Sequence, residues 1–370
     1  FSGVERVIGS RHADTFIGSA AIEQFDGGDG DDVFRGHLAG DTVNGGNGTD
    51  TLDFSGRDSS IYVDIATRKT ADGTLFTSIE KFVGTDYNDY FYGTTGNEIL
   101  IGGAGNDTIE GMAGADHMEG GDGGDTLVYR RSDAGVQVSL STGVGTGGHA
   151  QGDTFDGFEH LIGSAFNDSL VGTTGKNNIW GGSGNDTIDG RGGGDWIFGE
   201  AGNDTIRSRA EGWGNNILDG GDGWDTVNYD LSLVDGLVIN LDTGLTTNGV
   251  PQFSDTLVSI ENVTGSNQAD TITGSNGANI LDGGRGDDIL TGLGGYDTFR
   301  FTGPGFGNDT VCDFQDGVDR IAFVGNAKGF GDLAFEDLED ACVITVGGAG
   351  SITLAGMQSF MFSADDFTFA

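Results

Sequence analysis

The nine residues GGAGNDTIE at positions 102–110 decide how this chain folds, because the same pattern returns in phase along most of the sequence. The pattern is G-G-x-G-x-D-x-U-x, in which U is a large apolar residue. Twenty-one units of this kind fall into four arrays, at 9–53, 84–128, 163–228 and 265–300. A short unit that recurs in phase predicts a solenoid, in which each turn of the chain stacks on the turns beside it.

Each position of the unit has a physical reason. Glycine at positions 1, 2 and 4 allows positive φ angles and exposes backbone carbonyls inside a tight loop. Positions 7 to 9 then form a three-residue strand, whose alternation sends only the side chain at position 8 inward. That position is apolar in all twenty-one units, from Phe16 to Phe299. We therefore expect an all-β parallel solenoid with position 8 as its core.

Position 6 of the repeat carries the acidic side chain. Two units complete one coil, so we expect unit n to stack on unit n+2 about 4.8 Å away, with Asp14 above Asp32 and Asp32 above Asp50. Carboxylates about 5 Å apart repel by roughly 3 kcal/mol at an effective dielectric near 20. Calcium between them removes this repulsion, because its oxygen bonds of about 2.3–2.6 Å span the gap, whereas magnesium prefers shorter octahedral contacts.

Pairing n with n+2 predicts up to about 13 calcium sites. Glu23, Glu98, Asn177 and Asn279 each belong to the second unit of an array, where the turn is poor in glycine, and we expect weaker or empty sites there. The predicted metal ligands are the aspartates at position 6, namely Asp14, Asp32, Asp41, Asp50, Asp89, Asp107, Asp116, Asp125, Asp168, Asp186, Asp195, Asp204, Asp225, Asp270, Asp288 and Asp297.

Composition limits the partners. The 370 residues include 72 Gly and only 2 Pro, and the formal net charge is −41. This charge excludes nucleic acid and anionic membrane as partners, because both bind basic surfaces. No apolar run is long enough for a membrane-spanning helix. The opening residues, FSGVERVIGS, match the end of a spacer between arrays, so we expect a longer parent protein.

The arrays resemble the RTX (repeats in toxin) proteins, whose hemolysin-type calcium-binding repeats form a parallel β-roll, and the resemblance covers residues 1–300. Spacers at 54–83, 129–162 and 229–264 end in Ile-Glu or Phe-Glu shortly before the next array. They are too short to form a hydrophobic core of their own. We therefore expect each spacer to be a modified coil of the solenoid that carries a loop. The expected divisions are spacer end and array 1 (1–53), spacer and array 2 (54–128), spacer and array 3 (129–228), spacer and array 4 (229–300), and a C-terminal region (301–370).

Residues 301–370 have fewer glycine turns and more Phe than the arrays, and they end in SADDFTFA. This end resembles the C-terminal region of RTX exoproteins that are exported by type I (ABC transporter) secretion. The resemblance implies an ABC transporter as a partner and a secreted protein, extracellular or at the cell surface of a Gram-negative bacterium. A β-rich cap over the open end of the solenoid is compatible with the same residues.

We find no catalytic constellation and predict that this chain is not an enzyme. Calcium already accounts for the carboxylate pairs, and the histidines form no ligand spacing such as H-E-x-x-H. These histidines are His12, His37, His117, His149 and His160. Cys312 and Cys342 either form a disulfide, if the protein is extracellular, or stay two buried thiols.

Trp180 and Phe198 occupy the outward position 9 in neighbouring coils, and Trp196 adds to the same surface. Exposed aromatic clusters on such a solenoid indicate either a surface that binds a glycan or protein, or packing beneath a spacer loop.

The sequence thus favours a secreted, calcium-binding β-roll that folds on extracellular calcium. Its expected role is structural or adhesive, as in an S-layer or matrix, with polysaccharide or other copies of surface protein as partners. Two alternatives stay open. One is the C-terminal scaffold of a larger exoenzyme, such as a protease or a polysaccharide hydrolase, lyase or epimerase, and the other is a carbohydrate-binding module.

Overall fold

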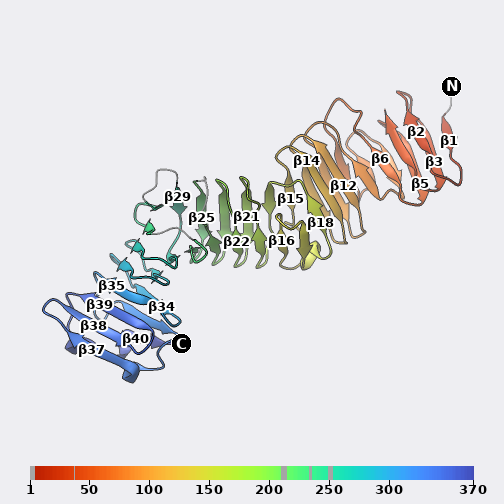
Figure 1. Ribbon diagram of the computed structural model, residues 1–370. Coiled ribbons are helices and arrows are strands. Elements are labelled where there is room, and N and C mark those ends of the chain that lie inside the picture. The colour runs from red at the N-terminus through yellow and green to blue at the C-terminus, as the bar shows by residue number, and fades with distance from the viewer. Residues whose placement is uncertain (1–4, 37, 210–214, 233–235, 249–252) are drawn as a thin grey trace. The chain divides into compact units, whose positions relative to one another are not determined.

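The structure is a computed structural model that describes residues 5–36, 38–209, 215–232, 236–248 and 253–370. Contacts between Cα atoms divide the chain into two compact units, residues 1–173 and 174–370. In both, two sheets of short strands, sheet A and sheet B, face each other across a narrow core (Figure 1).

The described residues of the first unit form ten strands in each sheet. Sheet A of the first unit contains β1 (Arg6–Ile8), β3 (Gln24–Asp29), β5 (Thr42–Asn47), β7 (Tyr62–Asp64), β8 (Lys69–Thr70), β9 (Leu75–Thr77), β11 (Tyr90–Thr94), β13 (Thr108–Met112), β15 (Thr126–Val128) and β19 (His160–Ile162). Sheet B contains β2 (Thr15–Gly18), β4 (Val33–Gly36), β6 (Thr51–Asp53), β10 (Lys81–Val83), β12 (Ile99–Ala104), β14 (His117–Asp122), β16 (Gln137–Ser139), β17 (Val144–Thr146), β18 (Thr154–Asp156) and β20 (Ser169–Val171). One 3-10 turn, η1 (Gly148–Ala150), lies in the second spacer.

The second unit repeats this plan. Its sheet A contains β21 (Asn178–Ser183), β23 (Trp196–Ala201), β25 (Ile217–Asp222), β27 (Val238–Asn240), β28 (Leu245–Thr247), β29 (Ser254–Val258), β31 (Thr271–Thr273), β33 (Ile289–Thr291), β35 (Gly307–Val311), β37 (Leu333–Asp337), β38 (Ala341–Val346) and β39 (Gly350–Ala355). Its sheet B contains β22 (Thr187–Asp189), β24 (Thr205–Arg207), β26 (Thr226–Asn228), β30 (Asn262–Thr264), β32 (Ile280–Asp282), β34 (Thr298–Thr302), β36 (Arg320–Val324) and β40 (Phe367–Phe369). Three 3-10 turns are η2 (Phe330–Asp332), η3 (Ser359–Met361) and η4 (Ala364–Asp366).

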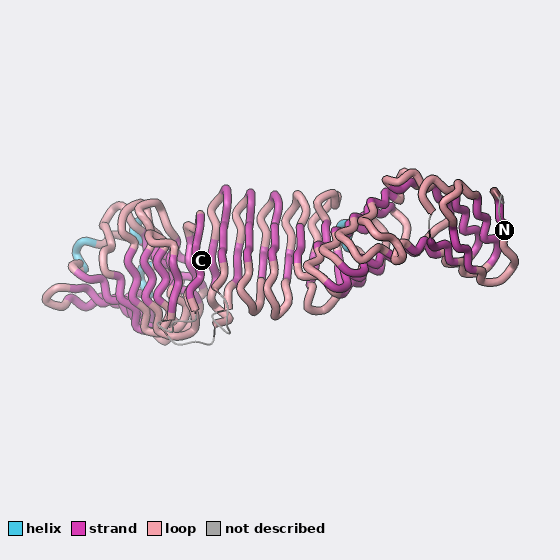
Figure 2. The backbone as a smooth tube through the Cα atoms, turned by 90° about the horizontal axis from the view of Figure 1, so that it is seen from above, coloured by secondary structure: helices cyan, strands magenta, loops and turns pink. Residues whose placement is uncertain are grey.

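Within the arrays, each strand pairs in parallel with the strand of the next but one unit, as the sequence predicts. Phe16 lies opposite Phe34, and Phe34 opposite Leu52, in the ladder of β2, β4 and β6. Ile188 and Ile206 are partners in the same way in the second unit. Figure 2 shows these strands side by side along the tube of each unit. The predicted all-β parallel β-roll is therefore confirmed.

Position 8 forms the core of the roll. Leu100, Ile109 and Leu127 are fully buried, as are Ile188 and Ile206, whereas their neighbours at position 7 are only partly buried. Position 9 varies, because Ile101 is partly exposed while Glu110 and Asp189 are buried. Burying a side chain of this size contributes about 1.5–3 kcal/mol. Because each nine-residue repeat supplies a single core residue, the core is one side chain wide in each sheet, and it extends only by adding further coils.

The spacers are modified coils. In the first spacer, β9 pairs in parallel with β5 and β7 pairs in parallel with β11, while β8 joins the two in antiparallel pairs. In the opposite sheet only β10 is added, between β6 and β12. The other two spacers insert the same three-stranded meander, through β16, β17 and β18 and through β27, β28 and β29.

The C-terminal region is built on the spacer plan. Strand β39 pairs in parallel with β35, β38 and β37 follow in antiparallel pairs, and β40 pairs in parallel with β36 in the opposite sheet. Aromatic rings close this end, with Phe367 at 5.4 Å from Phe330 and 6.0 Å from Phe362 between ring centroids. The region is β-rich, as expected. No helix in the described part of the chain is long and apolar enough to cross a membrane.

Candidate calcium sites

Position 6 forms a ladder of hydrogen bonds from coil to coil. The backbone N–H of Asp14 donates to Oδ1 of Asp32 at 2.8 Å, and that of Asp32 donates to Oδ1 of Asp50 at 2.8 Å. The same hydrogen bond joins further pairs of position-6 residues inside each of the two compact units, 1–173 and 174–370. With the donor first, these pairs are Glu23 and Asp41, Asp89 and Asp107, Asp107 and Asp125, Glu98 and Asp116, Asn177 and Asp195, Asp186 and Asp204, Asp204 and Asp225, Asp195 and Asn216, Asp270 and Asp288, and Asn279 and Asp297. The structure thus brings the predicted ligands together one coil apart. Asp168 and Asp186 lie on either side of the division between the units, and their pairing stays a prediction.

The second carboxylate oxygen of many of these aspartates has no hydrogen-bond donor. Oδ2 is buried and unsatisfied in Asp32, Asp50, Asp107, Asp116, Asp125, Asp204, Asp225, Asp288 and Asp297. A buried carboxylate oxygen without a partner carries the cost of its lost hydration. Nine repetitions of this arrangement indicate that a group outside the polypeptide satisfies these oxygens.

Glycine at position 1 allows a carboxylate oxygen and a backbone carbonyl oxygen to approach the same turn closely. A Cβ on Gly102 would lie less than 3.0 Å from both Oδ2 of Asp107 and the carbonyl oxygen of Gly120 in the next coil, which real Cβ atoms do not do. The same pair of oxygens flanks Gly199, from Asp204 and Gly220. A carboxylate oxygen and a carbonyl oxygen therefore converge where no side chain fits. Calcium prefers this donor set, since it accepts carboxylate and carbonyl oxygens in flexible geometry.

The crowded acids hold protons more tightly than free carboxylates. Burial, together with the smaller effect of the charges of Asp89 and Asp125, raises the pKa of Asp107 to about 7. Burial likewise raises the pKa of Asp116 to about 8 and that of Asp288 to about 8. Such shifts occur when the charged form lacks a counter-charge. A bound divalent cation would supply it.

Position 2 of the calcium-type turn requires a left-handed backbone. Glycine takes this role in several units, for example Gly103 with φ of 112°. Four units place Met112, Arg191, Glu200 or Leu293 there instead, and all four have φ between 67° and 75°. The left-handed conformation costs about 1–2 kcal/mol for a residue with a side chain. The fold imposes this conformation even where the residue opposes it.

The first two units of an array close their turns differently. In these units Ser or Thr stands at position 2, and in the seven pairs named below its backbone N–H donates to the position-6 side chain. Ser266 donates in this way to Oδ2 of Asp270 at 2.6 Å, and its hydroxyl donates to Oδ1 at 3.1 Å. The other pairs of this kind are Ser10 and Asp14, Ser19 and Glu23, Thr85 and Asp89, Thr94 and Glu98, Ser164 and Asp168, and Ser275 and Asn279. The hydroxyl-bearing residue satisfies the oxygen that is unpartnered elsewhere.

The hydrogen bond from Ser or Thr at position 2 occurs in first repeats of the arrays as well as in second repeats. The sequence predicts weak or empty sites only in the second unit, from its Glu or Asn and its glycine-poor turn. The structure gives the first unit the same internal partner, so Asp14, Asp89, Asp168 and Asp270 differ from the later aspartates. In Asp14, hydrogen bonds from the backbone and hydroxyl of Ser10 lower the pKa. The signal in the sequence is Ser or Thr directly after the first glycine.

Sequence reasoning misses several acids that continue the ladder. Asp153 and Asp255 accept the backbone N–H of Asp116 and Asn216, and each also accepts a hydrogen bond from a buried tyrosine hydroxyl, that of Tyr129 at 2.9 Å and Tyr229 at 3.0 Å. The ladder also continues past the last unit, to Asp309 and Asp319. Glu80, Glu159 and Glu261 close the three arrays that spacers follow. The Ile-Glu and Phe-Glu spacer endings are the available signal for these glutamates.

Side chains alone do not form a metal cluster here. Within the described ranges, no group of three or more His, Cys, Asp and Glu side chains could hold a metal ion. His37 lies outside these ranges. The oxygens around Gly102 and Gly199 indicate a donor set of backbone carbonyl oxygens together with carboxylates.

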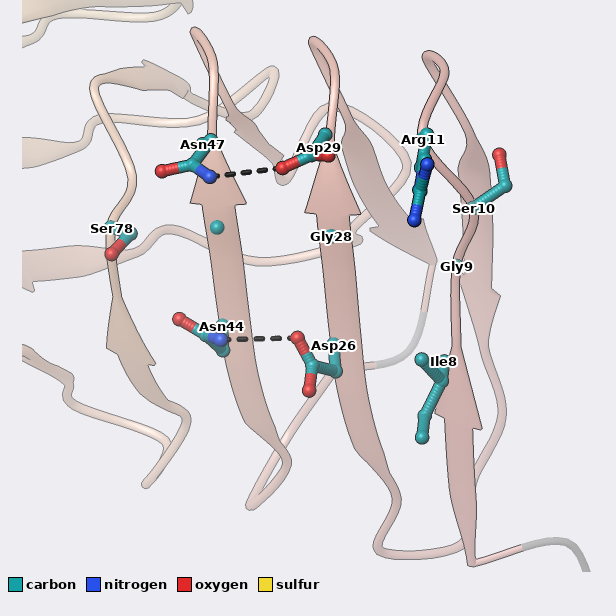
Figure 3. Close-up of a pocket in the computed structure, with 11 residues that line it drawn as sticks. Ile8, Gly9, Ser10, Arg11, Asp26, Gly28, Asp29, Asn44, Asn47 and Ser78 are labelled. Carbon is teal, nitrogen blue, oxygen red and sulfur yellow. Dashed lines mark hydrogen bonds between the residues drawn. The ribbon is translucent and has the colours of Figure 1, made fainter.

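The outer surface of the roll pairs its acids with amides. Figure 3 shows Asn44 donating to Asp26 at 3.1 Å and Asn47 donating to Asp29 at 2.9 Å, across β3 and β5. These acids stand at positions 9 and 3, which point away from the core. The outer ladder thus satisfies its carboxylates with protein donors, in contrast to the position-6 ladder inside the turns.

Two of the three aromatic side chains of the predicted ligand surface pack against each other. The rings of Trp180 and Phe198 stack with their centroids 5.8 Å apart and their planes 12° apart, so they turn their faces toward each other. Trp196 is 44% exposed, and Nζ of Lys176 lies 4.7 Å from its ring centroid. A sugar-binding platform needs a free aromatic face, and these contacts use part of it. Ligand binding at this surface stays a prediction.

Cys312 and Cys342 are both free thiols, so the disulfide considered from the sequence is not formed. The alternative of two buried thiols is also only half right, because Cys342 is buried and Cys312 is exposed. Burial raises the pKa of Cys342 to about 11.

Comparison with known proteins finds one family of repeats and similar solved structures. The family model of the RTX calcium-binding nonapeptide repeat (4 copies) matches residues 17–52, 92–127, 153–188, 162–197, 171–206, 213–231 and 264–299. Among solved structures, the crystal structure of extracellular lipase LipA from Serratia marcescens is similar at 21% identity, with a TM-score of 0.25, over 55% of this chain and 40% of the lipase chain. No curated protein matches the sequence. The chain thus carries RTX calcium-binding nonapeptide repeats in several copies along its length.

Proposed function

We propose that this chain is a secreted β-roll that binds calcium outside the cell and folds on it. The observation that carries the proposal is the set of nine buried Oδ2 atoms without donors, each in a position-6 aspartate. Calcium would be held by such an oxygen together with carbonyl oxygens of the next coil, for example Asp107 with Gly120. When bound, calcium supplies the positive charge that these turns lack.

The chain's own residues prepare the turn before any ion binds. The hydrogen bond from the N–H of Asp107 to Oδ1 of Asp125 fixes that carboxylate and leaves its other oxygen toward the turn. The left-handed φ of 112° at Gly103 shapes the loop. The net charge of −41 opposes compaction until cations neutralise it.

The favoured role is structural or adhesive, at the cell surface or in a matrix, because the described surfaces are long sheets with paired polar ladders such as Asp26 with Asn44. Export by a type I secretion system of a Gram-negative bacterium, and polysaccharide or further surface-protein copies as partners, belong to the same proposal. Extracellular calcium modules bind at about 10⁻⁴–10⁻³ M, so a chain of this kind would stay unfolded in the cytosol and fold outside. We also propose that the chain itself is not an enzyme.

The test is the response of the fold to calcium. Circular dichroism of the full chain should lose its sheet signal in EDTA and regain it on adding calcium in millimolar amounts, while magnesium at the same concentration should not restore it. Full sheet signal at nanomolar free calcium would overturn the proposal. For the role as a scaffold of a larger exoenzyme, the deciding measurement is the mass and N-terminal sequence of the mature protein from the medium.

A further inference from the structure

Three arrays end against a spacer instead of a further repeat unit. At each of these ends, the backbone N–H of the last position-6 aspartate donates to Oε2 of a glutamate from the spacer, at 3.0, 3.0 and 2.9 Å. The three pairs are Asp50 with Glu80, Asp125 with Glu159, and Asp225 with Glu261. The glutamate therefore takes the place that the next position-6 aspartate has inside an array.

The spacer also supplies the missing carbonyl. A Cβ on Gly120 would lie less than 3.0 Å from Oδ2 of Asp125 and from the carbonyl oxygen of Gly157, two residues before Glu159. Inside the array, the corresponding space at Gly102 is bordered by Oδ2 of Asp107 and the carbonyl of Gly120. The spacer thus reproduces the oxygen pair of the repeat units although its sequence does not contain the repeat.

The other two junctions have the same arrangement. Gly45 is bordered by Oδ2 of Asp50 and the carbonyl of Ser78, and Gly220 by Oδ2 of Asp225 and the carbonyl of Ser259. Figure 3 shows Ser78 beside the strand that carries Asn44 and Asn47.

The backbone of the spacer is strained at this point. Ser78 and Ser259 have φ of 51° and 50°, and Gly157 has φ of 69°. A left-handed backbone is unfavourable for serine, because its Cβ crowds the following carbonyl oxygen. Such a conformation persists only when its surroundings impose it, and it is common at ligand-binding positions. The residue with this conformation is in each case the one whose carbonyl faces the aspartate oxygen.

We propose that each spacer completes a calcium site at the end of the preceding array, in addition to the sites between repeat units. The donors are the buried, unpartnered Oδ2 of the last aspartate, the spacer carbonyl and the spacer glutamate. Asp50, Asp125 and Asp225 are fully buried, so their Oδ2 atoms have no access to bulk water. The inference rests on the calcium-binding function proposed above. It makes the spacer part of the calcium-dependent fold and couples each array to the next.

The test counts bound calcium in the full chain. A triple variant, Glu80→Gln with Glu159→Gln and Glu261→Gln, keeps an amide oxygen that accepts the aspartate N–H but removes three charges. Calcium per chain is measured by equilibrium dialysis and elemental analysis at the lowest free calcium that saturates the wild type. The triple variant should bind three fewer ions with its sheet circular dichroism retained. The matched control changes three exposed glutamates, Glu5, Glu336 and Glu339, to Gln and should bind the wild-type number.

Each outcome decides a separate point. A triple variant with the wild-type number and midpoint overturns the spacer sites, while the calcium-binding function stands. A wild type that binds no calcium overturns that function itself. If the triple variant does not fold in saturating calcium, the single variants replace it: a loss of one ion in each supports the inference, and no loss in any of them overturns it.

Discussion

Asp107 and Asp125 lie one coil apart, and the backbone N–H of Asp107 donates to Oδ1 of Asp125 at 2.7 Å while Oδ2 of Asp125 has no donor. The two oxygens of one carboxylate therefore have different tasks. Oδ1 joins neighbouring coils by a hydrogen bond to a charged acceptor, which contributes about 1.5–3 kcal/mol. Oδ2 faces the turn. A coil without calcium retains the first interaction and lacks a partner for the second.

Filling the space at position 1 should block a calcium site. In Gly102→Ala, the added Cβ would clash with Oδ2 of Asp107 and the carbonyl of Gly120. We expect one bound calcium fewer, a higher calcium midpoint and a loss of about 1–3 kcal/mol in the free energy of unfolding, as for an overpacked site. Calcium titration followed by circular dichroism measures both. The control is Gly56→Ala, where no atom lies within 4 Å of the added Cβ, and equal midpoints for the two variants would contradict the assignment.

The core position should be far more sensitive than its outward neighbour. Ile188 is fully buried and opposite Ile206 in the ladder of β22 and β24. Ile188→Ala should therefore lower the free energy of unfolding by about 2–5 kcal/mol, through lost burial and a residual cavity. Thr187→Ala, on the outward side of the same strand, should cost less than about 0.5 kcal/mol. Urea unfolding in saturating calcium compares the two, and similar costs would contradict the inward position of residue 8.

The calcium-free chain should be more stable in acid than at neutral pH. Asp107, Asp116 and Asp288 have pKa values of about 7, 8 and 8 when folded, above the ordinary value of 3.8. As pH rises from about 4 to 8, the unfolded chain ionises first, so the folded state loses stability across this range and the full penalty holds above pH 8. Circular dichroism of calcium-stripped protein should show more sheet at pH 5 than at pH 8. An unchanged or opposite dependence would refute the prediction.

With calcium present, the pH dependence should reverse. Protons compete with calcium for the same carboxylates, so the calcium midpoint should rise as pH falls below about 7. Calcium titrations at pH 6 and pH 8 check this, and equal midpoints would argue against these aspartates as ligands.

The C-terminal strand should be needed for a closed end. Phe367 is buried in β40 and contacts the rings of Phe323, Phe330 and Phe362. Phe367→Ala should destabilise this end by about 3–5 kcal/mol, whereas Phe360→Ala, at a 79% exposed ring, should have little effect. Thermal unfolding in calcium measures the difference.

The C-terminal residues should also be needed for export from the cell. Deleting residues 363–370 should leave most calcium sites intact and retain the protein in the cell, if a transporter reads this end. Because β40 is part of the folded cap, Phe367→Ala serves as the control for cap damage alone. If the truncated chain reaches the medium at normal yield, residues 301–370 act only as a cap and not as an export signal.

The sequence by itself determined the repeat, the core and the stacking. The apolar residue at position 8 and the acid at position 6 recur with a fixed separation, and a period of nine residues per strand fixes which residues become neighbours, such as Asp107 and Asp125. The pairing of n with n+2 followed from this period without any knowledge of the spacers.

Only the tertiary structure decided how the spacers join the ladder and which turns close on themselves. Asp50 and Glu80 are 30 residues apart, Asp125 and Glu159 are 34, and Asp225 and Glu261 are 36, so no period connects these pairs. The meander of three antiparallel strands absorbs the difference in length, and backbone hydrogen bonds then bring each glutamate to its aspartate. The closure of Asp270 by Ser266 likewise depends on the direction of one N–H, which is set by the local backbone angle and not by the spacing of residue types.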